Sequence, residues 1–241
     1  MAKKIKAELA ESLKYDLKCH KDKEGRELVL FTRDNVARVE SMIRNDSDYS
    51  DQGTSSATYW LRELSKVLSG KKSTHKYEEI IQECVNGVDR TNSTHINADG
   101  VGREELAQRI CKLSKETLVE YLKNPRKEHY KLIEILSQPT HPKDSKHYAR
   151  KNYSFATKFC HYAAFYVFEN DEEQDNFSIY DSVVAKNIKP YAKYYGLKVS
   201  PNIGSNYDAF ISLVDGIIQK SGKEISRNGF DHLLWYFHKA R

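Results

Sequence analysis

The side chain with the strongest chemical signal is Lys158, which lies in the aromatic and aliphatic segment from Tyr153 to Phe168. Ser154 is expected to cap a helix there, because apolar residues then recur with a helical period. A cation near a helix N-terminus opposes the macrodipole, and this field together with an apolar surrounding lowers the pKa of an amine. Since a neutral amine is the form that attacks as a Schiff-base nucleophile, Lys158 is a candidate nucleophile. The alternative is a surface lysine whose aliphatic stem lies along the helix.

The second candidate group is the carboxylate of Asp181. The acidic run from Glu169 to Asp175 indicates an exposed loop, after which Phe177 to Tyr180 is apolar enough to lead the chain back inside. Asp181 then precedes a predicted helix, 182–188, and aspartate is a preferred N-cap. Asp181 could serve as a helix cap and nothing more, and Lys158 could be an ordinary surface lysine. Considered singly, each residue therefore has a structural and a chemical interpretation.

Taken together, the two segments resemble the catalytic segment of the helix-hairpin-helix DNA glycosylases, within them the 8-oxoguanine DNA glycosylase type. The resemblance rests on Thr157-Lys158 opening one helix and Ile179-Tyr180-Asp181-Ser182 opening the next, and it covers chiefly residues 150–241. It implies that Lys158 attacks the sugar C1′ of a flipped nucleotide, and that Asp181 orients the amine and stabilises charge on the sugar. One difference is that Tyr153-Ser154-Phe155-Ala156 lacks the glycines that are usual in the family's hairpin.

The resemblance also implies a wider set of contacts. Contacts with DNA are expected from Lys146, Arg150, Lys151, Ser154, Thr157, His161 and Ser182, and a base pocket from Phe159, Trp235 and Arg241. Neither a metal nor a cofactor is expected. His161 has an alternative interpretation as a hydrogen-bonded core residue. The lysine-rich segment before the helix, residues 143–151, has an alternative interpretation as a solvated helix face. Gly100-Val101-Gly102, directly before another helix, is a competing phosphate-binding element.

The elements that must position these residues are predicted to be helices almost throughout. A first helix is expected within 1–26, and further helices over 34–44, 57–68, 77–85, 103–113, 118–123, 128–137, 207–218 and 227–238. Ser114 is expected to cap the helix over 118–123, Gly70 and Gly87 to end two others, and Pro190 to restart one. The last helix is expected to have an apolar face formed by Phe230, Leu233, Leu234 and Phe237. The fold class is therefore all-α with at most one short strand pair, arranged as two helical lobes with a central cleft. Residues 1–140 form an unassigned helical region, and residues 141–241 the catalytic region.

Composition is compatible with this prediction without arguing for it. Of the 241 residues 30% are charged and 39% hydrophobic, and the net charge of +5 is only mildly basic. The four cysteines are scattered without metal-ligand spacing, and no apolar run reaches the length of a membrane span. These features predict a cytoplasmic, nucleoid-associated monomer with no membrane partner.

The function predicted from the sequence is a DNA glycosylase with AP lyase activity, acting on double-stranded DNA that contains a damaged or modified base. The resemblance implies an oxidised purine such as 8-oxoguanine. Three alternatives stay open: a catalytically silent DNA-binding module of the same fold, a defence glycosylase acting on modified viral bases, and a helical protein-interaction domain.

Overall fold

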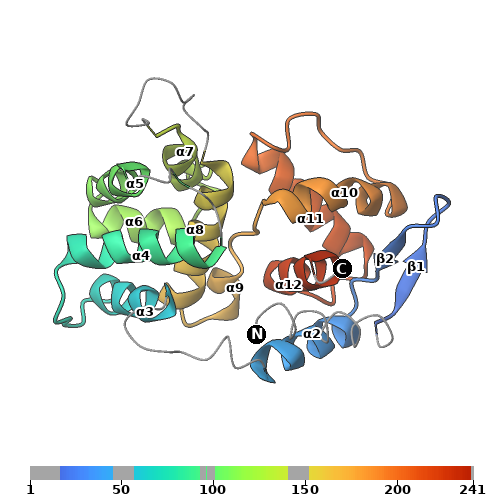
Figure 1. The fold of residues 1–241 in the computed structure, drawn as a ribbon, viewed down its shortest axis with the longest axis horizontal. Coiled ribbons are helices and arrows are strands. Elements are labelled where there is room, and N and C mark those ends of the chain that lie inside the picture. The colour runs from blue at the N-terminus through green and yellow to red at the C-terminus, as the bar shows by residue number, and fades with distance from the viewer. Residues whose placement is uncertain (1–16, 46–56, 93–95, 97–100, 141–151, 240–241) are drawn as a thin grey trace. The chain divides into compact units, whose positions relative to one another are not determined.

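The protein is mostly helical in the part of the chain that its structure describes. A computed structural model describes residues 17–45, 57–92, 96, 101–140 and 152–239. Within them the only sheet has two antiparallel strands, and the remaining regular structure is helix (Figure 1). The expectation of an all-α protein with at most one strand pair is confirmed. None of the described helices is long and apolar enough to cross a membrane.

The chain forms two compact units, and one of them is discontinuous in sequence. The terminal unit combines residues 1–50 with residues 180–241, and the middle unit comprises residues 51–179. These limits differ from the regions 1–140 and 141–241 named from the sequence, which stay a functional prediction. Lys158 therefore belongs to the middle unit, whereas Asp181 lies at the point where the chain enters the terminal unit for the second time.

The described part of the terminal unit contains a small hairpin and four helices. Its described elements are β1 (Cys19–Lys21), β2 (Glu27–Val29), α2 (Arg33–Asn45), α10 (Ser182–Tyr194), α11 (Tyr207–Lys220) and α12 (Arg227–Lys239). The strands pair antiparallel with Cys19 opposite Val29. Phe31 stacks on Phe230 at 4.7 Å and contacts the Tyr191 ring at 5.0 Å, so the aromatic core joins the N-terminal segment to α10 and α12. The apolar positions of the helix expected within 1–26 run from Ile5 to Leu17 and lie almost wholly outside the described residues. Only residues 19–21 of that range form β1.

The middle unit is built around one buried helix. Its elements are α3 (Ala57–Leu68), α4 (Tyr77–Asn92), α5 (Val101–Cys111), α6 (Lys115–Lys123), α7 (Lys131–Ser137), α8 (Tyr153–Val167) and α9 (Asp171–Gln174). Ten of the fifteen residues of α8 are buried, because α3, α4, α6 and α7 all pack against it. A helix that is apolar around most of its circumference belongs in a core. Position 158 is thus placed in an interior helix.

Local signals located several helix ends correctly. Ser114 caps α6, its Oγ accepting from the Thr117 N–H at 3.1 Å. Gly70 has a φ of +76° and follows α3, and the Lys71 N–H donates to the Lys66 carbonyl at 2.8 Å, which is the bonding pattern of a glycine-terminated helix. The apolar face predicted for the last helix is confirmed, because Phe230, Leu233, Leu234 and Phe237 are all buried on α12.

Two other predictions of helix ends are wrong. The helix expected to end before Gly87 continues through it to Asn92, because Gly87 lies at a close approach to α3: a Cβ there would be 2.8 Å from the Ala57 Cα. Pro190 does not restart a helix but lies inside α10, where buried Ile188 and Tyr191 hold both sides of the proline to the core.

Candidate active site

The helix that carries Lys158 begins two residues earlier than the sequence suggested. Asn152, not Ser154, occupies the N-cap position of α8, and Ser154 lies in its first turn. The Asn152 side chain makes no cap bond. It donates instead to the Gln138 carbonyl at 3.1 Å, while the Asn152 N–H donates to the Ser137 carbonyl at 3.1 Å. Asn152 thereby joins the end of α7 to the start of α8, a role that sequence reasoning missed.

Lys158 lies in the second turn of α8 and is only 6% exposed. It is therefore not a surface lysine. Its neighbours Thr157 and Phe159 are fully buried, and the Phe159 ring stacks on Phe155 at 5.9 Å. No acidic residue occurs in α8, so any counter-charge for the amine must come from another element.

The thiol nearest to Lys158 in sequence is unsuited to nucleophilic chemistry. Cys160 has no exposed surface, and burial raises the pKa of its thiol well above the ordinary value. Burial raises the pKa of the Cys84 thiol in α4 in the same way. Because the thiolate is the reactive form, both cysteines stay inert thiols at neutral pH. The candidate nucleophile on α8 is therefore the amine.

His161 is a buried, hydrogen-bonded residue one turn after Lys158. It is 2% exposed, and its Nδ1 lies 3.1 Å from the carbonyl oxygen of Phe177. A carbonyl only accepts hydrogen bonds, so Nδ1 must carry the proton. His161 therefore has the surroundings of a hydrogen-bonded core histidine, as its alternative interpretation predicted. Its contact with DNA stays a prediction. Its bond fixes the chain four residues before Asp181, a tie between the two candidate segments that the sequence did not reveal.

Asp181 caps α10, as predicted. Its Oδ1 accepts from the N–H groups of Val183 at 2.9 Å and Val184 at 3.1 Å, and the residue is 7% exposed. Both cap bonds use the same oxygen, so capping engages one of the two carboxylate oxygens. A carboxylate held by two backbone donors has a fixed orientation, which suits a group that stabilises charge at a defined point.

The remaining predicted residues are distributed over both units. Ser154, Thr157, Phe159 and His161 share α8 with Lys158, whereas Ser182 is exposed in the first turn of α10 and Trp235 is half-buried on α12. The Thr157 hydroxyl donates to the Ser154 carbonyl at 3.1 Å. Lys146, Arg150, Lys151 and Arg241 lie outside the described residues.

The competing element, Gly100-Val101-Gly102, is described only in part. Gly100 lies outside the described residues, Val101 begins α5 and Gly102 is buried within it. In the described part of the chain, no group of three or more His, Cys, Asp or Glu side chains is placed to hold a metal ion.

No protein-family model, curated protein or solved structure matches the chain, so the interpretation of the candidate site rests on the geometry described above.

Proposed function

We propose that this protein is a DNA glycosylase with AP lyase activity and that Lys158 is its nucleophile. The observation that carries the proposal is the burial of Lys158 on α8, a helix without any acidic residue. Removing an amine from water penalises its charged form and favours the neutral form that a Schiff base requires. A lysine that serves only solubility has no reason to occupy such a position.

In the proposed reaction the target nucleotide first leaves the base stack, because C1′ is inaccessible inside a duplex. The Lys158 Nζ lone pair attacks C1′, the glycosidic bond breaks, and the base departs with the bonding electrons and acquires a proton. Opening of the sugar ring and loss of a proton from the nitrogen-bound intermediate give a Schiff base at C1′. Removal of a C2′ proton then expels the 3′ phosphate, which is the lyase step.

Asp181 acts in this proposal on the positive charge that develops at the sugar. Its two cap bonds from Val183 and Val184 hold one carboxylate oxygen, so the orientation of the group is set before DNA binds. An oxidised purine such as 8-oxoguanine is the proposed base, as the sequence resemblance implies, with a modified viral base as the alternative substrate.

A catalytically silent DNA-binding module is the second candidate, and one observation favours it. Tyr153, Ser154, Phe155 and Ala156, which the resemblance equates with a hairpin, form the first turn of α8. These four residues are therefore helical and do not form a hairpin. A module that retained the helices but not the hairpin would bind DNA and leave the sugar intact.

Borohydride trapping tests the proposal directly. The full chain is mixed with a duplex that contains one abasic site, and borohydride reduces any Schiff base to a stable covalent adduct. We expect an adduct with the native protein and none with Lys158→Gln. The matched control is Lys112→Gln, which removes an exposed lysine from the same unit and should leave the adduct in place.

Two results would decide against the proposal. A gel shift without an adduct from the native protein identifies the silent module. An adduct that persists in a folded Lys158→Gln protein assigns the chemistry to a different amine.

A further inference from the structure

The exposed face of α10 carries a line of three lysines. Lys186, Lys189 and Lys193 are all exposed, and their spacing of three and four residues places them on one side of the helix. The opposite side is buried through Val184, Ile188, Tyr191 and Ala192. We call the three lysines the lysine stripe. The helix is thus amphipathic, with a single kind of charge on its outer side.

The charge of the lysine stripe has little compensation. No acidic residue occurs between Ser182 and Tyr207, and α10 alone among the described helices carries three lysines and no acid. Lys193 pairs with Glu24 at 3.0 Å, but Arg26 also pairs with that carboxylate, at 2.8 Å. Lys186 and Lys189 make no ion pair with any described residue. The pairs at Glu24 are exposed, so they hold these side chains only weakly.

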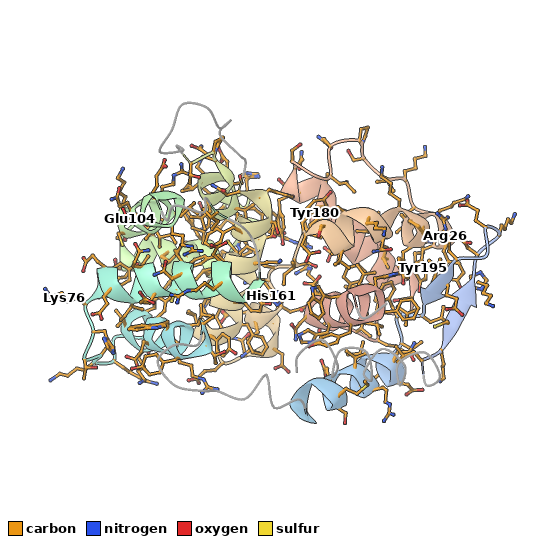
Figure 2. All side chains as sticks on the ribbon, viewed as in Figure 1. Arg26, Lys76, Glu104, His161, Tyr180 and Tyr195 are labelled. Carbon is orange, nitrogen blue, oxygen red and sulfur yellow. The ribbon has the colours of Figure 1, made fainter. Side chains whose placement is uncertain are left out.

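An exposed aromatic residue adjoins the end of the lysine stripe. Tyr194 is 41% exposed and is the only large apolar or aromatic side chain in the exposed class among the described residues. Its ring lies 4.5 Å from the ring of His20 on β1, tilted by 35°. Figure 2 shows Tyr195, directly after α10, on the same side of the unit as Arg26 in the β1–β2 turn.

The dimensions and chemistry of this surface fit a nucleic-acid backbone. The lysine stripe spans seven residues, or roughly 10 Å at about 1.5 Å per residue. Phosphates of one DNA strand recur every ~3.4 Å along the axis, so this length corresponds to about three nucleotides. An exposed ring beside such a row can stack on an unpaired base. Insertion into a membrane surface would instead need a face of exposed apolar side chains, which the described part of this unit does not have.

We propose that the lysine stripe binds the phosphate backbone of DNA and that Tyr194, supported by His20, contacts a base. This surface shares its ligand with the proposed glycosylase activity but none of its chemistry, because the lysine stripe is exposed and lies on a different helix from Lys158. Its role is to hold DNA on the terminal unit, so binding through it needs no reaction at the sugar.

The test is the salt dependence of DNA binding. Fluorescence anisotropy of a labelled 20-base-pair duplex is measured between 50 and 200 mM salt with the native protein and with the triple variant Lys186→Gln, Lys189→Gln, Lys193→Gln. We expect the slope of log affinity against log salt to become shallower by about 0.9 for each phosphate that the variant no longer neutralises, so by up to about 2.7. The matched control is Lys71→Gln, Lys72→Gln, Lys76→Gln, which removes the same charge from exposed lysines of the middle unit and should leave the slope unchanged.

A second measurement isolates the aromatic contact. With a labelled single-stranded 20-mer, Tyr194→Ala should weaken binding roughly tenfold without changing the salt slope, because stacking releases no counterions. Tyr194→Phe keeps the ring and should keep the affinity.

Several outcomes overturn this inference. An unchanged slope in the stripe variant does so, and so does an equal change in both triple variants, which would report net charge alone. The same holds if the stripe variant binds DNA normally but no longer binds phosphatidylserine vesicles, which would make the surface a membrane contact. The experiments separate this inference from the proposed function. A covalent adduct with the native protein, together with an unchanged salt slope in the stripe variant, contradicts only the role of the lysine stripe. A shallower slope in the stripe variant without any adduct from the native protein contradicts only the proposed glycosylase chemistry.

Discussion

Two of the helices that the structure describes carry lysine without any acidic residue, and the lysines have opposite surroundings. On α8 the single lysine, Lys158, is 6% exposed, on a helix against which α3, α4, α6, α7 and α9 pack. On α10 the three lysines of the stripe are exposed, and only the opposite side of the helix is buried. The residue type is the same in both cases and the helices are of similar length, so the difference lies in access to water.

Burial decides which chemistry a lysine can perform, because it changes the free-energy cost of the charged amine. A solvated ammonium keeps its proton and its charge, which suits contact with phosphates. A desolvated amine is penalised when charged, and its lone pair then becomes available for attack. Neither helix carries an acidic residue of its own, so any carboxylate partner of these lysines comes from another element, as Glu24 does for Lys193.

The largest expected effect separates the two kinds of lysine by kinetics. Lys158→Gln should lower kcat for base excision by more than about a thousandfold, as loss of a nucleophile does. The stripe variant should keep kcat and raise KM, because it loses binding that is equal in the ground and transition states. Steady-state excision from a damaged duplex provides both constants. If the stripe variant lost kcat while Lys158→Gln kept it, the contrast between the helices would be reversed.

The next effect concerns the carboxylate at the start of α10. Asp181→Asn should slow excision by roughly 10²–10³ while DNA binding persists, because the sugar then has one electrostatic stabiliser fewer. Asparagine caps as well as aspartate, so the melting temperature should not change. Asn206→Ala is the matched control: it removes the cap bond that the Ala209 N–H makes to Asn206 at 3.0 Å at the start of α11. That variant should lose about 1 kcal/mol of stability and keep its excision rate.

A contrary pattern at Asp181 would identify it as a structural cap only. In that case Asp181→Asn would excise at the native rate, and only Asp181→Ala, which removes the cap, would melt earlier.

The smallest expected effect concerns the bond that links α8 to the segment before Asp181. His161→Leu leaves the buried Phe177 carbonyl without its donor, which should cost about 1–3 kcal/mol of unfolding free energy. It should also lower kcat, because the chain leading to Asp181 loses its anchor. Thermal melts and single-turnover excision provide the two readouts.

The control for that variant is a comparable buried bond elsewhere. The Tyr191 hydroxyl accepts from the Val29 N–H at 3.0 Å and is 2.9 Å from His238 Nε2. Tyr191→Phe should lower stability by a similar amount and keep kcat. Equal kinetic effects of the two variants would show that His161 contributes only to stability.

The sequence determined those features that depend on a few neighbouring residues. The caps at Ser114 and Asp181 and the glycine that ends α3 were predictable, because each uses hydrogen bonds within about five residues of chain. The buried face of α12 was predictable from its period. Lys158 and Asp181 could be selected as chemical candidates from residue type, helix position and family resemblance alone.

The tertiary structure decided what depends on residues distant in sequence. Gly87 reads locally as a helix end, yet α4 passes through it because Ala57 of α3 packs there. The start of α8 was misplaced because Asn152 is engaged by the end of α7. The return of residues 180–241 to the N-terminal segment left no local signal, since the aromatic contacts of Phe31 with Tyr191 and Phe230 join residues 160 or more positions apart. The burial of Lys158 has the same origin, because solvent is excluded by packing partners and not by the helix that carries the residue.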